Sequence, residues 1–190
     1  MNTTALKRFA QDARKQLTGI VSQKIEYVLT QDTPELRDSE KQLRDLKEEI
    51  KKYGKEGVVE RVAYIWFNRL TALRFMDVNS YNTPMIVTPA EGDTLPQILK
   101  DAKGGHIAPE LTVDRRRLND LLDGKTAVND PQNEAYRLLL IAACNHLNGV
   151  MPLMFERIQD YTELLMPDDL LSRHSIVNLI REEMHTEDCT

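Results

Sequence analysis

The stretch VERVAYIWFNRLTALRFMDVNSY, residues 59–81, constrains the fold more than any other part of the chain. It holds the only tryptophan, two of the four phenylalanines and two tyrosines, together with three arginines. Successive residues of an α-helix are rotated by about 100°, and at this spacing one broad apolar face contains Val58, Val62, Ile65, Trp66, Leu70, Leu73 and Met76. Phe67 and Phe75 fall towards the opposite side. The pattern predicts a helix over about 58–78 that is buried on both sides.

Arginine inside this apolar pattern needs an explanation. Arg69 falls near the middle of the main apolar face. An unpaired charge there would cost several kcal/mol, so a carboxylate or several carbonyls must meet the guanidinium group. We interpret Arg69 as half of a structural ion pair that fixes how helices meet. Arg74 lies well away from Arg69 around the helix, where it is either solvated or part of an interface.

Two amphipathic segments precede this helix. Apolar residues at helical spacing predict a long first helix that runs to about Leu29. Its other face carries four cations, either as a solvated surface or as phosphate contacts: Lys7, Arg14, Lys15 and Lys24. After a break at Pro34, a thin apolar stripe among alternating charges predicts an exposed helix that ends at Gly54 and Gly57.

Residues 80–112 differ in composition from the helical segments, because they are rich in proline and glycine. Such a composition predicts an irregular excursion, with short strands around 85–88 and 106–107 and a brief helix at 96–102. Excursions of this length are usually functional or disordered rather than part of a core.

Helices are expected to resume beyond the excursion. Thr112 can cap a helix that ends at Gly124, and Pro131 and Gly149 mark the two ends of the next helix. Two or three shorter helices should follow.

The last of these short helices has two candidate caps, Ser172 and Ser175, and Pro152 and Pro167 separate the others. The predicted fold class is therefore mainly α: a multi-helix bundle around a central buried helix at about 58–78, with an irregular excursion at 80–112 that can hold short strands. We expect a single helical domain over 1–190, made of a helical hairpin arm (1–57) and a helical core (58–190).

Composition and motifs exclude several function classes. A net charge of −5 argues against binding nucleic acid through bulk charge alone. The histidines and the two cysteines lack metal-ligand spacing, and no nucleotide-binding loop or nucleophile elbow is present. No run approaches the roughly 18 apolar residues that span a bilayer, and the N-terminus lacks the layout of a secretory signal. We expect a cytoplasmic protein without a membrane partner, a metal or a cofactor in this segment.

The motif DRRR at 114–117 is the sharpest basic cluster. Arg115, Arg116 and Arg117 could pin a phosphate of DNA or RNA near a helix start. The alternative is a solvated first turn or an ion-pair hub.

Three segments carry a resemblance to a known family. AYIWFNRLTALRFMDVNSY (63–81), CNHLNGVMPLMFE (144–156) and ELLMPDDLLSRHSIVNLI (163–180) resemble, in the same order, blocks near the N-terminus of the BREX phage-defence adenine-specific DNA methyltransferases, the PglX group. In that family a helical N-terminal region precedes a methyltransferase core that binds S-adenosylmethionine and a C-terminal part that recognises DNA. The family's N-P-P-Y type motif and its glycine-containing cofactor motif have no match here, so no catalytic or cofactor-binding residue can be carried over.

The resemblance implies an architectural role for the matching helix. Trp66, Arg69 and Phe75 would form a structural hub against which later domains or neighbouring helices pack. Arg69 and Arg74, with the DRRR arginines, are the candidate contacts to DNA or to another domain. The implied partners are DNA and the downstream methyltransferase domain, with other defence proteins or phage inhibitors as further candidates.

Two functions follow from these observations. The first is the N-terminal helical module of an adenine-specific DNA methyltransferase of a phage-defence system, which docks other domains, contacts DNA and is not itself catalytic. The second is a stand-alone helical adaptor that binds protein partners through the thin-striped helix or the 80–112 excursion.

Overall fold

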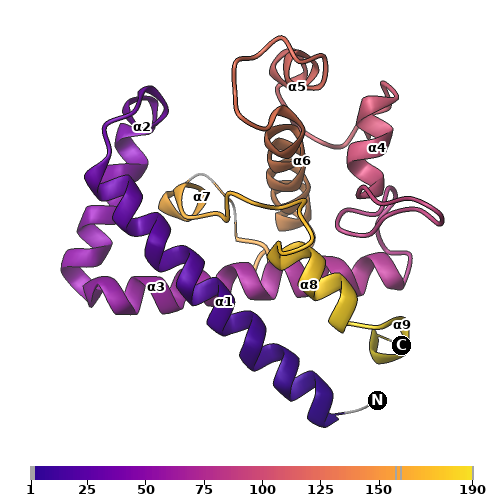
Figure 1. Ribbon diagram of the computed structural model, residues 1–190, viewed down its shortest axis with the longest axis horizontal. Helices are drawn as coiled ribbons and strands as arrows, with labels where there is room; N and C mark the ends of the chain where they lie inside the picture. Colours follow the sequence, from indigo (N-terminus) through magenta and orange to yellow (C-terminus); the bar gives the residue numbers. More distant parts are fainter. Residues whose placement is uncertain (1–2, 157, 159, 190) are drawn as a thin grey trace. The chain divides into compact units, whose positions relative to one another are not determined.

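The structure is a computed structural model that describes residues 3–156, 158 and 160–189. Within these ranges the chain forms helices and no strand, which confirms the mainly α class (Figure 1). The expected strands at 85–88 and 106–107 are wrong, since the excursion holds only an isolated bridge between Pro89 and Pro96.

The described residues divide into two compact units. The first unit contains Thr3–Asn68 and Ile158–Asp168, and the second unit contains Arg69–Arg157 and Asp169–Thr190. This grouping differs from the division after residue 57 that we expected from the sequence. The central helix contributes its residues up to Asn68 to the first unit and the remainder to the second.

The first unit begins with α1 (Thr3–Thr30), close to the predicted bounds. Most of the apolar stripe that the helical spacing predicted is buried: Phe9, Ala13, Leu17, Val21 and Val28. Its other three members, Leu6, Ala10 and Ile20, are half-buried, and Ile25 is buried in addition. The Phe9 ring packs against the Phe67 ring at a tilted angle, with the centroids 6.1 Å apart. Burial of such a stripe, rather than intrinsic propensity, is what stabilises a helix of this kind.

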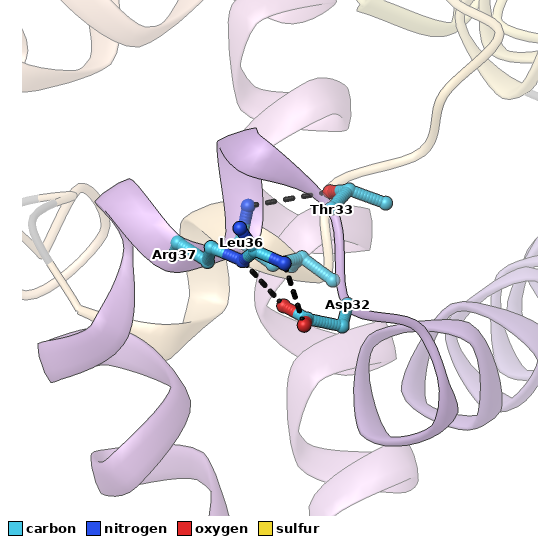
Figure 2. A network of polar contacts seen from close by, with 4 residues as sticks. All are labelled: Asp32, Thr33, Leu36 and Arg37. Carbon is cyan, nitrogen blue, oxygen red and sulfur yellow. Dashed lines mark hydrogen bonds and ion pairs between the residues drawn. The ribbon is translucent and has the colours of Figure 1, made fainter.

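The break at Pro34 forms a short capped helix, α2 (Pro34–Asp38). Thr33 precedes it in an extended conformation, and its hydroxyl oxygen accepts the Leu36 N–H at 3.4 Å (Figure 2). The Arg37 guanidinium donates two parallel hydrogen bonds of 2.8 Å each to the Asp32 carboxylate. Proline at the first helical position is favourable because its missing N–H has no intrahelical partner there.

The long helix α3 (Glu40–Val78) joins the two helices that we expected on either side of Gly54. Gly54 alone leaves the helical conformation, with φ 76° and ψ 159°, and the helix continues directly after it. The sequence therefore predicted the interruption at Gly54 correctly, whereas Gly57 lies inside the helix. A left-handed φ of this kind favours glycine, which has no Cβ to clash.

Burial around α3 is less complete than predicted. Trp66, Leu70 and Leu73 are buried, and the Trp66 indole N–H donates to the Thr162 carbonyl at 3.2 Å within the first unit. Phe75, however, is 43% exposed, and Tyr64 is also exposed. The expectation of burial on both sides is wrong at these positions, because the side opposite Trp66 remains open there.

The second unit is centred on α6 (Pro131–Asn148) and also contains α4 (Gln97–Lys103), α5 (Arg115–Leu122), α8 (Ile176–Glu183) and α9 (Thr186–Cys189) (Figure 1). α7 (Tyr161–Leu164) belongs to the first unit. The predicted ends of α6 are confirmed, and its apolar residues form the core of this unit: Ala135, Tyr136, Leu139, Leu140, Ala143 and Cys144.

Among the helices α5, α6 and α8 of the second unit, the caps of α6 and α8 lie where the sequence predicted the helices to begin. Asp130 accepts the Asn133 N–H at 2.9 Å, and Ser175 caps α8. The cap of α5 is Asp114, which accepts the Arg117 N–H at 3.0 Å, rather than the expected Thr112. A carboxylate one residue before the helix can reach these N–H groups, whereas Thr112 lies too far along the chain to do so.

Candidate functional site

Asp77, near the end of α3, holds the beginning of the excursion in place. Its buried carboxylate accepts the backbone N–H groups of Ile86, Val87 and Thr88 at 2.8–3.1 Å. It also accepts the Asn82 side-chain amide at 2.8 Å. Because one carboxylate satisfies donors that would otherwise pair in a sheet, this apolar run is ordered without forming a strand.

Arg74 is buried and makes its contacts inside the second unit. Its Nε and Nη2 donate to the Met184 carbonyl at 3.2 and 3.1 Å, and Nη1 donates to the Thr88 hydroxyl at 3.0 Å. Burial lowers the pKa of this guanidinium group from its ordinary value. The solvated alternative is therefore wrong, and these contacts join α3 to the end of α8 and to the excursion.

Arg69 is also buried, with 1% of its surface exposed. Its Nη2 donates to the backbone carbonyl of Glu156 at 2.8 Å, within the second unit. We expected a carboxylate or several carbonyls to contact the Arg69 guanidinium group. The Glu156 carbonyl is one such contact. The Arg69 charge also lies near Cys144, where burial raises the pKa of the thiol to about 12 and the guanidinium opposes that rise.

A small cavity opens beside the C-terminal half of α6. It has a volume of about 90 Å³ and is lined by Tyr81, Asn82, Thr83, Pro84, Ile86, Ile98, Ala108, Glu110, Leu111, Ala143, His146 and Leu147. An enclosed apolar cavity of about 150 Å³ can hold a benzene ring. This smaller cavity is of a size to receive one apolar side chain.

Exposed apolar side chains occur at this cavity and in the loop that follows α6. Tyr81 is 67% exposed, and its ring packs against that of Phe75 with the centroids 6.3 Å apart. The loop after α6 exposes Val150 by 70%, Leu153 by 98% and Met154 by about half. We call these five residues the α6-end surface. Single exposed apolar residues are ordinary, whereas a cluster of them is typical of an interaction site.

The DRRR arginines lie at the start of α5. Arg115, Arg116 and Arg117 are all exposed, and their side chains form no hydrogen bond or ion pair with the rest of the described chain. A helix N-terminus carries a partial positive charge, so cations in the first turn are unfavourable by themselves. An anion such as a phosphate would relieve this repulsion.

The cationic face of α1 has two different environments in the first unit. Arg14 and Lys15 line a groove of about 240 Å³ together with Gln11, Thr18, Glu60 and Ala63. Lys24 instead forms an ion pair with Asp168. Of these two environments, only the groove keeps cations available to an anion.

None of the described helices could span a membrane. No group of three or more histidine, cysteine or acidic side chains in this part of the chain is arranged to hold a metal ion.

Two known adenine-specific methyltransferases are similar in sequence to this chain. No family model matches the chain. Adenine-specific methyltransferase BrxX of Escherichia coli O9:H4 (strain HS) is 34% identical over 138 residues, which cover 71% of this chain and 11% of that protein. Adenine-specific methyltransferase PglX of Lacticaseibacillus casei (strain Zhang) is 28% identical over 205 aligned residues, which cover 87% of this chain and 16% of that protein.

These matches confirm the resemblance inferred from the three sequence segments. The chain is homologous to a part of these adenine-specific methyltransferases, and it spans less than a fifth of the length of either relative.

Proposed function

We propose that this chain is a non-catalytic helical module of an adenine-specific DNA methyltransferase of a BREX phage-defence system. In this proposal it docks against the part of the protein that binds S-adenosylmethionine and transfers the methyl group. The observation that carries the proposal is the unequal coverage of the matches. They include 71% and 87% of this chain but only 11% and 16% of the two relatives.

The chemistry of the described residues supports a structural role for the module. Arg69, Arg74 and Asp77 are buried, and they form hydrogen bonds with backbone and side-chain groups of the second unit. Trp66, Arg69 and Phe75 keep the proposed role of a packing hub on α3.

DNA contact is the second part of the proposal. Arg115, Arg116 and Arg117 present three exposed cations at a helix start, where phosphate oxygens would be favourable neighbours. The net charge of −5 makes strong binding by this chain alone unfavourable. The module would therefore add a few phosphate contacts to binding that the remainder of the enzyme provides.

Calorimetry with S-adenosylmethionine tests the non-catalytic assignment. The 190-residue chain should give no binding heat, whereas the product of the complete reading frame that contains this sequence should bind the cofactor. Tight cofactor binding by the 190-residue chain would overturn the proposal. A reading frame that ends at residue 190 would instead favour a stand-alone adaptor.

A further inference from the structure

The residues of the α6-end surface come from two distant parts of the sequence, and both parts are connected to the end of α6. Phe75 packs against Tyr81, and Tyr81 lines the same cavity as Leu147. The Leu147 carbonyl in turn accepts the backbone N–H groups of Val150 at 3.0 Å and Met151 at 2.8 Å. The exposed rings and the exposed loop are therefore both linked to Leu147, near the end of α6.

The chemistry of this surface favours a protein partner over a nucleic acid. Aromatic residues and methionine are enriched in the cores of protein interfaces, where charged residues are depleted. The acidic residues beside the surface, Glu110 at the cavity and Glu156 after the loop, would repel phosphate. The cavity of about 90 Å³ would receive one apolar side chain of the partner.

We propose that the α6-end surface is the contact between this module and the methyltransferase part of the same polypeptide. The inference rests on the function proposed above, and it specifies which surface performs the docking. Both sides of the surface lie in the segments 63–81 and 144–156, which resemble the methyltransferase family. The two relatives extend several times beyond the matched region, so a large part of such a polypeptide is available as the occupant.

Hydroxyl-radical footprinting tests this contact without any substitution, because methionine and aromatic side chains report their own exposure. The experiment compares the 190-residue chain with the product of the complete reading frame. Oxidation of Met154 and Tyr81 should be about fivefold or more slower in the complete protein, as expected for side chains moved into an interface core. Tyr53, which is similarly exposed but lies outside the surface, serves as the internal control.

A variant of the complete protein identifies the cause of the protection. Val150→Asp together with Leu153→Asp should restore oxidation of Met154 and Tyr81 to the rate of the 190-residue chain. Both side chains are largely exposed, so the variant should fold normally. The control is Val128→Asp, which places one such charge at an exposed valine outside the surface and should preserve the protection.

The outcomes separate this inference from the proposed function. If the reading frame continues into a methyltransferase and oxidation is equal in the two proteins, the docking surface is wrong and the proposed function stands. If the reading frame ends at residue 190, both are wrong. Protection that appears in the 190-residue chain with rising concentration, together with a dimeric mass, would assign the surface to a second copy and overturn the inference.

Discussion

Arg69 in α3 donates a hydrogen bond to the backbone carbonyl of Glu156, which lies 87 residues further along the chain. The bond joins α3 to the loop after α6, and so it connects two of the three segments that resemble the methyltransferase family. Only 1% of the Arg69 surface is exposed, so its charge needs such a buried contact.

Arg69→Ala should lower the free energy of unfolding by about 3 kcal/mol, because it removes a charge-assisted hydrogen bond and the packing of a large buried side chain. Denaturant titration of the 190-residue chain measures this change. The control is Arg61→Ala, which removes an exposed ion pair with Glu49 and should cost at most about 1 kcal/mol. Equal midpoints for the two variants would show that Arg69 is solvated.

Asp77→Ala should release the excursion from α3. The N–H groups of Ile86, Val87 and Thr88 would lose their acceptor, at a cost of about 3 kcal/mol for a buried charged group. Hydrogen exchange resolved by residue should show much faster exchange at these three amides. Asp77→Asn retains one acceptor oxygen and should have an intermediate effect, whereas unchanged exchange in both variants would contradict the assigned contacts.

Cys144 should make stability depend on pH in the alkaline range. Burial raises the pKa of its thiol from 9.0 to about 12, so the unfolded chain loses this proton at a lower pH than the folded chain. The contribution is fully present below pH 9.0 and is lost as the pH rises towards about 12, by about 1.4 kcal/mol per pH unit.

The difference in unfolding free energy between the parent chain and Cys144→Ala isolates this effect. That difference should be constant below pH 9.0 and should shrink above it, because the two chains differ only in the presence of the thiol. A difference that is independent of pH would show that the thiol is accessible to water.

Replacement of Arg115, Arg116 and Arg117 by alanine should weaken the binding of DNA to the complete protein, equally for all sequences. The slope of log K against log salt should become shallower by about 0.9 for each lost phosphate contact. The matched control replaces Lys41, Arg44 and Lys47, three exposed cations of α3, and changes the net charge equally. Identical slopes for the two triple variants would exclude a specific contact at α5.

Local signals in the sequence predicted most of the helix ends. Pro131 and Gly149 predicted the bounds of α6, and Gly54 predicted the interruption of α3, because proline and glycine act through the backbone of their own turn. The buried stripe of α1 was equally predictable, since helical spacing alone determines which side chains share a face.

The contacts of the candidate site depend on residues far apart in sequence, and these could not be predicted. Arg74 lies 110 residues from the Met184 carbonyl that it meets, and no local pattern indicates such a partner. The run around Ile86 was expected to form a strand because it is apolar. Its N–H groups instead donate to the Asp77 carboxylate, and period and propensity do not reveal that alternative.

The exposure of the loop after α6 could not be predicted from the sequence either. Val150, Leu153 and Met154 have the composition of a core segment, and the sequence alone does not distinguish a buried turn from an exposed one. Their exposure is visible only in the structure, and it is one of the observations on which the proposed docking surface rests.

The mass of the native protein tests the central claim most directly. Antibodies raised against this chain should detect, in the cells that produce it, a polypeptide several times heavier than 21.9 kDa, as the proposed function predicts from the coverage of the two relatives. Peptides of the detected polypeptide should extend into a methyltransferase sequence. A native protein of 21.9 kDa without additional sequence would contradict the account.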